Sequence, residues 1–302
     1  MLELAVSPNV AAALNDGRAV VALESTIFSN LGLPSPANRD ALDRCTAAIR
    51  AGGAVPAVTA VLDGIARVGL GEGEYTRVLG PARKVAERDL PVAIAQRWEF
   101  GATTVSASVA LAAIASISVF ATGGIGGVHR GSELTGDISA DLDALASWPV
   151  ITVSAGAKAF LDLARTLEFL ETRGVPVLGW QHDDFPAFYT RSSGLPVPHR
   201  VDDAAEVARV FASRSRPFSG VLVAAPIPAD AELDSGRLDA VLEGALRDAA
   251  ASGIVGAAVT PFVLGRIAEA TDGDSIPANL ALAEHNASVA AQIAVAVAAA
   301  RS

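Results

Sequence analysis

The sequence is short of cysteine, of lysine and of net positive charge. Its 302 residues include a single cysteine, Cys45, which excludes an internal disulfide and a cysteine-based zinc cluster and is typical of a reducing compartment. Acidic residues outnumber basic ones and the formal net charge is -10, which argues against nucleic-acid binding by bulk electrostatics. An anionic substrate would therefore need positive groups placed locally.

One segment could be mistaken for a membrane span, because residues 101–128 carry no charge. Ala, Ser, Thr and Gly dominate this segment, and the glycines of residues 123–127 would break a helix, so it is interpreted as a buried helix followed by a strand. The N-terminal residues lack the basic and apolar regions of a signal peptide. We expect a cytoplasmic protein with neither nucleic-acid nor membrane partners.

Alternating apolar and amphipathic segments predict one α/β domain over residues 1–302, a three-layer α/β/α sandwich around a mostly parallel sheet. Strands are expected at residues 19–26, 90–96, 117–122, 150–154, 175–180 and 220–225. Helices are expected at residues 36–51, 102–115, 140–147, 159–172, 203–212, 233–251, 261–271 and 275–300. Residues 55–68 form a small hairpin excursion that turns at Asp63-Gly64. The helix with Cys45 carries several charges and is expected on the surface.

Two of the predicted strands end in loops of small residues. Residues 123–127 (GGIGG) follow one strand, and Ala155-Gly156-Ala157-Lys158 follows the next. Ligands of open α/β sheets bind outside the carboxyl ends of the strands, so both loops are expected to face one crevice. The glycine-rich turn does not match G-x-G-x-x-G and no Walker lysine follows it, so by itself it is weak evidence for a phosphate site.

Lysine is the rarest cation of the chain. Only Lys84 and Lys158 occur among 23 basic residues, and the other 21 are arginines. Arginine does not give up its proton at neutral pH, whereas a lysine amine becomes a nucleophile when burial or a neighbouring cation lowers its pKa. Lys158 follows a strand end and small residues that let a ligand approach, so it is the candidate nucleophile. For Lys84, composition alone favours a functional role no more than a chance occurrence of lysine.

Carboxylates supply the remaining candidates. Glu24 leaves an apolar strand, where it is either a general acid with a pKa raised by burial or a structural carboxylate with a bonded partner. Asp137 and Asp141 flank Ser139, which could cap the helix expected at residues 140–147. They suit an anion-binding helix terminus or a hard divalent cation such as Mg²⁺ or Mn²⁺, although an ordinary acidic N-cap is favoured by the pattern alone. The four histidines show no metal-ligand spacing.

Several longer motifs carry a resemblance to a known family. They are ALEST at residues 22–26, GAVPA at 53–57, RDLP at 88–91, GATTV at 101–105, FATGGIGGVHRG at 120–131, DISADL at 137–142, AGAK at 155–158, FPAFYTR at 185–191, TPF at 260–262 and GDS at 273–275. In this order, and over nearly the whole chain, the sequence closely resembles the pseudouridine-5'-phosphate glycosidase family, which includes the indigoidine-synthase-A-like proteins.

The resemblance implies an enzyme of nucleotide catabolism that reversibly cleaves the C–C glycosidic bond of pseudouridine 5'-phosphate to uracil and ribose 5-phosphate, a lyase-type reaction. It implies that Lys158 forms a Schiff base with C1' of the ring-opened ribose and that Glu24 is the proton donor. It also implies a manganese ligand at Asp137, or a site there for Mg²⁺ or another divalent cation, and a homotrimer. The substrate-contacting positions that it implies are Lys84, Val105, Ser139, Ala140, Asp141 and Asn286.

The chain departs from the family pattern at His285, which stands where the family commonly has an asparagine before Asn286. Two other functions remain open. A sugar kinase would share the glycine-rich α/β/α sandwich, but no convincing catalytic aspartate is found in an anion-hole turn and Lys158 occupies that place. A metabolite-binding protein of a biosynthetic pathway would tolerate loss of Lys158 without losing its ligand.

Overall fold

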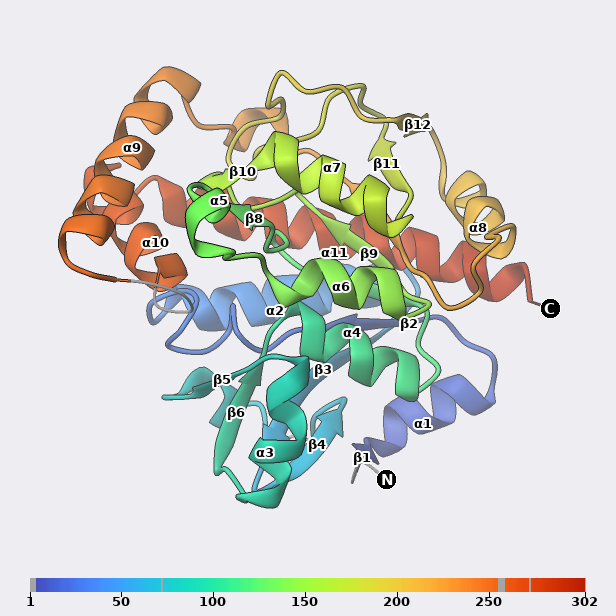
Figure 1. The fold of residues 1–302 in the computed structure, drawn as a ribbon. Helices are drawn as coiled ribbons and strands as arrows, with labels where there is room; N and C mark the ends of the chain where they lie inside the picture. The colour runs from blue at the N-terminus through green and yellow to red at the C-terminus, as the bar shows by residue number, and fades with distance from the viewer. Residues whose placement is uncertain (1–3, 72, 255–258, 272, 302) are drawn as a thin grey trace.

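A large, mostly parallel sheet forms the centre of the protein (Figure 1). The computed structural model describes residues 4–71, 73–254, 259–271 and 273–301. The main strand order is β1 (Leu4–Val6), β4 (Ile65–Val68), β3 (Val55–Leu62), β2 (Val20–Leu23), β7 (Val119–Ala121), β9 (Ile151–Ser154), β13 (Val221–Ala224), β11 (Val177–Trp180) and β12 (His199–Val201). All neighbours from β3 to β12 in this order pair in parallel. The predicted α/β fold is confirmed.

The predicted hairpin is the antiparallel pair of β3 and β4, which turns at Asp63 and Gly64. Both turn residues have positive φ, 53° and 77°, as a two-residue hairpin turn requires. The hairpin continues into a sheet extension in which β6 (Phe100–Thr103) pairs antiparallel with β3 and parallel with β5 (Arg83–Val85). This extension matters for function because β5 carries Lys84.

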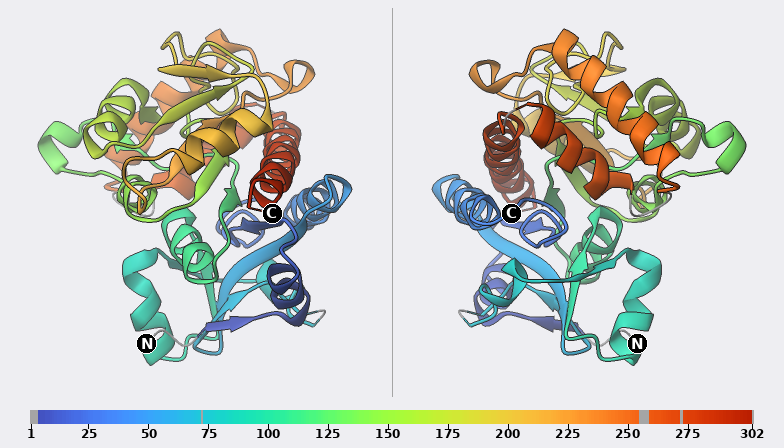
Figure 2. Two further views of the ribbon diagram at one scale, coloured as in Figure 1. Left: turned by 90° about the vertical axis from the view of Figure 1, so that its right-hand side faces the viewer. Right: turned by 90° about the vertical axis from the view of Figure 1, so that its left-hand side faces the viewer.

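Helices cover both faces of the sheet (Figures 1 and 2). On one face α11 (Ser275–Ala299) lies across β2, β7 and β9 and packs against α2 (Ala37–Ala51) and α8 (Ala204–Ala212). On the other face α4 (Val105–Ile114), α6 (Ala140–Ser147) and α7 (Leu163–Arg173) pack side by side. The remaining elements are α1 (Pro8–Asn15), α3 (Leu90–Ala95), α5 (Ser132–Thr135), α9 (Ser235–Ala251), α10 (Val259–Ala270), the strand pair β8 (Val128–His129) and β10 (Leu161–Asp162), and three 3₁₀ turns at Arg77–Leu79, Glu87–Asp89 and Ala229–Ala231.

The apolar character of α11 comes from its central position. Among the described residues it is the one helix long and apolar enough to cross a membrane by length and composition, yet 61% of the relevant stretch is buried inside the protein. Buried small residues such as Ala287, Ala290 and Ala291 let it approach the sheet and α2 closely. This is the pattern of a core helix.

Three local expectations are wrong. Residues 90–96 form the helix α3 rather than a strand, because a short apolar run fits both periods and Pro91 suits a first helical turn. Cys45 is buried, since α2 is covered by α11. The helix expected from residue 159 begins at Leu163, because Asp162 caps it by accepting the N–H of Arg165 at 3.0 Å.

Candidate active site

The candidate site lies at the carboxyl ends of three neighbouring parallel strands. Glu24 directly follows β2, Thr122 directly follows β7, and the loop to Lys158 follows β9. Because these strands are adjacent and parallel, the residues after them meet at one edge of the sheet. The expectation that the glycine-rich loop and the lysine loop share a crevice therefore agrees with the topology.

Backbone hydrogen bonds join the two loops directly. The N–H of Ala155 donates to the carbonyl of Gly123 at 2.9 Å, and the N–H of Ile125 donates to the carbonyl of Gly156 at 3.1 Å. The N–H of Lys158 returns to the carbonyl of Ile125 at 3.1 Å. The position of the lysine backbone is thus set by the glycine-rich loop.

The long irregular segment at residues 183–199 closes over these loops. The N–H of Phe188 donates to the carbonyl of Ala155 at 3.0 Å, and its ring lies against Gly124. Gly156 has φ +71°, and a Cβ there would come within 2.1 Å of the carbonyl oxygen of Pro186. Glycine at this position is therefore required both by the backbone conformation and by the close approach of the covering segment.

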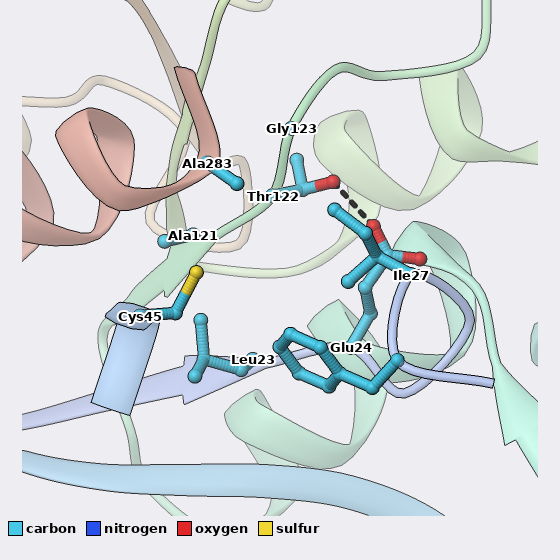
Figure 3. A pocket seen from close by; sticks show the side chains of 9 residues that line it. Leu23, Glu24, Ile27, Cys45, Ala121, Thr122, Gly123 and Ala283 are labelled. Carbon is cyan, nitrogen blue, oxygen red and sulfur yellow. Dashed lines mark hydrogen bonds between the residues drawn. The ribbon is translucent and has the colours of Figure 1, made fainter. Parts of the chain in front are cut away.

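Glu24 is a buried carboxyl group with one described hydrogen-bond partner. Its exposed fraction is 9%, and the hydroxyl of Thr122 donates to its Oε1 (Figure 3). Burial raises the pKa of Glu24 above its ordinary value, while the positive charge of Lys158 and the Thr122 hydrogen bond oppose this shift. A carboxyl group in such surroundings can hold a proton at higher pH than an exposed one, which suits the general acid expected from the sequence.

The two lysines interact electrostatically with each other and with the carboxylates near them. Lys158 is half-buried, and Lys84 lies on β5 as a residue that keeps access to solvent. The pKa of Lys84 is lowered by desolvation and by the charge of Lys158, and the carboxylates of Asp141, Glu24 and Asp137 oppose this effect. Both lysines and three of the predicted carboxylates therefore interact electrostatically.

Asp141 has a role that its position in the sequence did not indicate. Its buried carboxylate accepts the N–H of Ser106 through Oδ1 and the N–H of Gly126 through Oδ2, each at 2.9 Å. It therefore ties the first turn of α4 to the glycine-rich loop. Ser139 caps α6 as expected, accepting the N–H of Asp141 at 3.3 Å.

Val105 and Ala140 are the first residues of α4 and α6, so both predicted contact positions lie at helix N-termini that Asp141 brings together. Val105 is buried and Ala140 is exposed. A helix N-terminus carries partial positive charge and favours an anion such as a phosphate.

Asp137 is partly exposed beside His129. Its Oδ2 lies 3.7 Å from Nδ1 of His129, and its carbonyl accepts the N–H of that residue at 3.1 Å. Burial and the charges of the two lysines lower the pKa of His129, whereas the negative charge of Asp137 raises it by a smaller amount. Within the described ranges no three His, Cys, Asp or Glu side chains gather as a metal cluster. One accessible carboxylate with bound waters is nevertheless an accepted environment for Mg²⁺ or Mn²⁺.

Asn286 lies buried on α11, behind the loop that follows β7. Its Nδ2 donates to the carbonyl of Thr122 at 2.8 Å and to that of Gly123 at 3.2 Å. Its Oδ1 is buried and has no hydrogen-bond partner among the residues that the structure describes. His285 is half-buried, and burial together with the charge of Arg191 lowers its pKa.

Neither Thr122 nor Cys45 was predicted as a site residue, although both line a small pocket beside Glu24 (Figure 3). The other residues of its wall are Leu23, Ile27, Phe28, Ala121, Gly123 and Ala283. Burial raises the pKa of the Cys45 thiol to about 12, so at neutral pH it is an inert wall residue. The signal that could have indicated Thr122 was its place directly after a strand next to that of Glu24.

A family model for indigoidine synthase A-like proteins matches residues 9–296 of this chain. The chain belongs to the indigoidine synthase A-like family. Proteins of known structure share its fold over almost the full length. A prealnumycin C-glycosynthase in complex with ribulose 5-phosphate superposes with a TM-score of 0.90 at 36% identity, covering 99% of this chain and 98% of that one. An indigoidine synthase A-like protein of Thermotoga maritima superposes with a TM-score of 0.88 at 32% identity, covering 98% of this chain and 97% of that one.

Curated relatives of this family member are more similar still in sequence. The pseudouridine-5'-phosphate glycosidase of Methylobacterium nodulans is 50% identical over 301 residues, which cover 98% of this chain and 88% of the relative. The protein of the same name from a Nocardioides species is 50% identical over 295 residues, covering 96% and 95%.

Proposed function

We propose that this chain is a pseudouridine-5'-phosphate glycosidase, which reversibly converts pseudouridine 5'-phosphate to uracil and ribose 5-phosphate. Full-length relatives at about half identity support the assignment of the reaction. The observation that supports the chemistry is that Glu24 and the Lys158 loop follow β2 and β9, the two strands that flank β7, and that the charge of Lys158 acts on the buried carboxyl of Glu24. A related synthase that makes C-glycosides was solved with a phosphorylated pentulose, which supports a sugar phosphate as ligand.

A C–C glycosidic bond lacks the leaving group on which ordinary glycoside hydrolysis depends, so acid catalysis by two carboxyl groups is insufficient. In the proposed reaction the Lys158 amine bonds to C1' as the bond from C1' to the ring oxygen breaks, and the ring oxygen gains a proton. The bond from C1' to the base then breaks: its electron pair stays with the base carbon, which gains a proton, and the lone pair of the Lys158 nitrogen forms an imine to C1'. Water hydrolyses that imine, which releases ribose 5-phosphate and restores the amine. Glu24 supplies and recovers the proton.

The phosphate is proposed to lie between Lys84 and the start of α6, near Ser139 and Ala140. The lysine charge and the helix N-terminus both favour a dianion there. Asp141 supports this region chiefly through its two backbone amides, so contact between its carboxylate and the ribose would be an addition to that role.

A divalent cation, Mn²⁺ or Mg²⁺, is proposed at Asp137, where the partly exposed carboxylate provides one hard oxygen ligand and leaves room for waters. Such a cation would supply positive charge close to the substrate phosphate. A homotrimer is a further proposal and rests on family resemblance, and a cytoplasmic location is proposed from the single cysteine. Isothermal titration of Mn²⁺ into wild type and Asp137→Ala would test the cation site, and light scattering of the purified protein would test the trimer.

The decisive experiment traps the covalent intermediate. The protein is incubated with ribose 5-phosphate, reduced with borohydride, digested and analysed by mass spectrometry for an adduct on the peptide with Lys158. Lys158→Arg should keep the fold and the charge but lose both the adduct and uracil release, because only the nucleophile is removed. Lys84→Arg is the matched control, and it should still form the adduct at sufficient sugar phosphate.

Tight binding of ribose 5-phosphate without any adduct would support a metabolite-binding protein instead. ATP-dependent turnover of a sugar by unmodified protein would support a kinase. Measurable uracil release by Lys158→Arg would contradict the imine mechanism.

A further inference from the structure

Thr122 and Glu24 occupy matching positions on neighbouring strands. Strands β2 and β7 pair in parallel with Leu23 opposite Ala121, so Glu24 and Thr122 are the next residues in the same register. The Thr122 hydroxyl donates to Oε1 of Glu24, and only 5% of Thr122 is exposed (Figure 3). The contact is thus made between two strand ends in the buried floor of the site.

The backbone of Thr122 is held from both sides. Its N–H donates to the carbonyl of Val153 at 3.0 Å, and its carbonyl accepts from Nδ2 of Asn286 at 2.8 Å. The same amide group and the N–H of Ala155 hold the next carbonyl, that of Gly123. A β-branched residue with a fixed backbone has few side-chain rotamers available, so the direction of the hydroxyl is well determined.

The other carboxyl oxygen of Glu24 has no hydrogen-bond partner within the part of the chain that is described. The charged groups that act on Glu24 are Lys158 from the loop after β9, Asp141 from α6 and Lys84 from β5, and none of them is hydrogen-bonded to it there. Thr122 therefore occupies Oε1 and leaves Oε2 for the reacting molecule.

A hydroxyl group suits a carboxyl group that changes its protonation state. It donates to Oε1 of the carboxylate, and it can still donate to Oε1 as the carbonyl oxygen of the acid when the proton is on Oε2, so the contact survives both halves of a proton transfer through Oε2. A charged amine in the same place would instead strongly favour the carboxylate. Threonine thus holds the acid in one orientation without locking it in one state.

We infer that Thr122 is a positioning residue for the proton transfer by Glu24, fixing Oε1 through both protonation states so that Oε2 faces the substrate. This inference rests on the proposed function in so far as Glu24 is the proton donor. It assigns to Thr122 no contact with the reacting atoms.

The test compares three variants. Thr122→Val keeps the shape and removes the hydroxyl, Thr122→Ser keeps the hydroxyl, and Thr152→Val makes the same change in buried strand β9, where the hydroxyl has no partner among the described residues. For cleavage of pseudouridine 5'-phosphate we expect Thr122→Val to lower kcat about tenfold or more, because a hydrogen bond to a charged group is lost. Thr122→Ser should recover most of this loss, and Thr152→Val should match wild type.

The second readout is the titration of Glu24, followed in substrate-free protein by ¹³C NMR of labelled glutamate carboxyls and assigned by the signal missing from Glu24→Gln. Its midpoint should move upward by about one pH unit in Thr122→Val, since the donor that favours the carboxylate is gone. An unmoved midpoint, or a serine variant no better than valine, would overturn the inference. If wild type neither forms the Lys158 adduct nor releases uracil, the proposed function fails, and the NMR result still decides whether Thr122 controls Glu24.

Discussion

Replacing Asp141 by asparagine should destabilise the protein far more than a change of one atom suggests. The two oxygens of the Asp141 carboxylate accept backbone N–H groups from Ser106 and Gly126, each at 2.9 Å, and the side chain is 6% exposed. Asparagine offers one acceptor oxygen, and its NH₂ group would face the second N–H. One bond would be lost and one buried donor would stay unpaired.

The magnitude follows from those two groups. A hydrogen bond to a charged acceptor contributes about 1.5–3 kcal/mol, and an unsatisfied buried donor costs about 1–3 kcal/mol. Part of this loss is recovered by local relaxation, so we expect the free energy of unfolding to fall by about 2–4 kcal/mol. Activity should fall as well, because Gly126 belongs to the loop that positions the backbone of Lys158.

Urea denaturation followed by circular dichroism measures the effect as a lower transition midpoint at unchanged slope. Asp143→Asn is the matched control on the same helix. The Asp143 carboxylate is exposed and pairs with Arg173 at 2.8 Å, a surface ion pair worth about 0–1 kcal/mol. If Asp141→Asn loses no more stability than Asp143→Asn, the structural role assigned to the two amide contacts is wrong.

Two further predictions concern Glu24 and Gly156. The pKa of Glu24 is raised above its ordinary value of 4.5, so from pH 4.5 up to the raised pKa the folded protein binds more protons than the unfolded chain, and stability falls as pH rises. Glu24→Gln should remove this fall and be more stable than wild type above that range, although inactive. Gly156→Ala should lower both stability and activity, because its Cβ would come within 2.1 Å of the Pro186 carbonyl oxygen.

Both predictions have internal controls. For Glu24→Gln the quantity is the difference in the free energy of unfolding between variant and wild type, measured by urea titration from pH 4 to pH 8, and a difference that does not grow with pH would contradict the assignment. For Gly156→Ala the control is Gly194→Ala, which also has positive φ, +75°, but nothing within 4 Å of the added Cβ. Equal losses in the two variants would mean that backbone strain, not the close approach of Pro186, dominates.

Much of the fold could be predicted because its signals are local. The alternation of apolar strands and amphipathic helices, the Asp63-Gly64 turn and the N-cap of α6 at Ser139 each depend on a few neighbouring residues. The prediction failed where a local pattern was ambiguous. Residues 90–96 are too short to separate a buried helix from a strand, and the charges around Cys45 concealed that α11 covers that helix.

The placement of the glycine-rich loop and of the lysine loop at one edge of the sheet also followed from the sequence, through the rule that parallel strands bring their carboxyl ends together. The hydrogen-bond partners of the site residues could not be predicted from the sequence. Thr122 is 98 residues from Glu24, and Asn286 is 164 residues from Thr122.

The sequence by itself determined which chemical groups are available, a scarce amine and a carboxyl group each placed just beyond a strand, because those facts depend on residue type and local pattern. Only the tertiary structure decided that Asp141 is held by two backbone amides and that the Glu24 carboxyl meets a threonine hydroxyl. The reason is physical: a hydrogen bond depends on distance and direction in space, and strand order sets these between segments whose separation along the chain carries no such information.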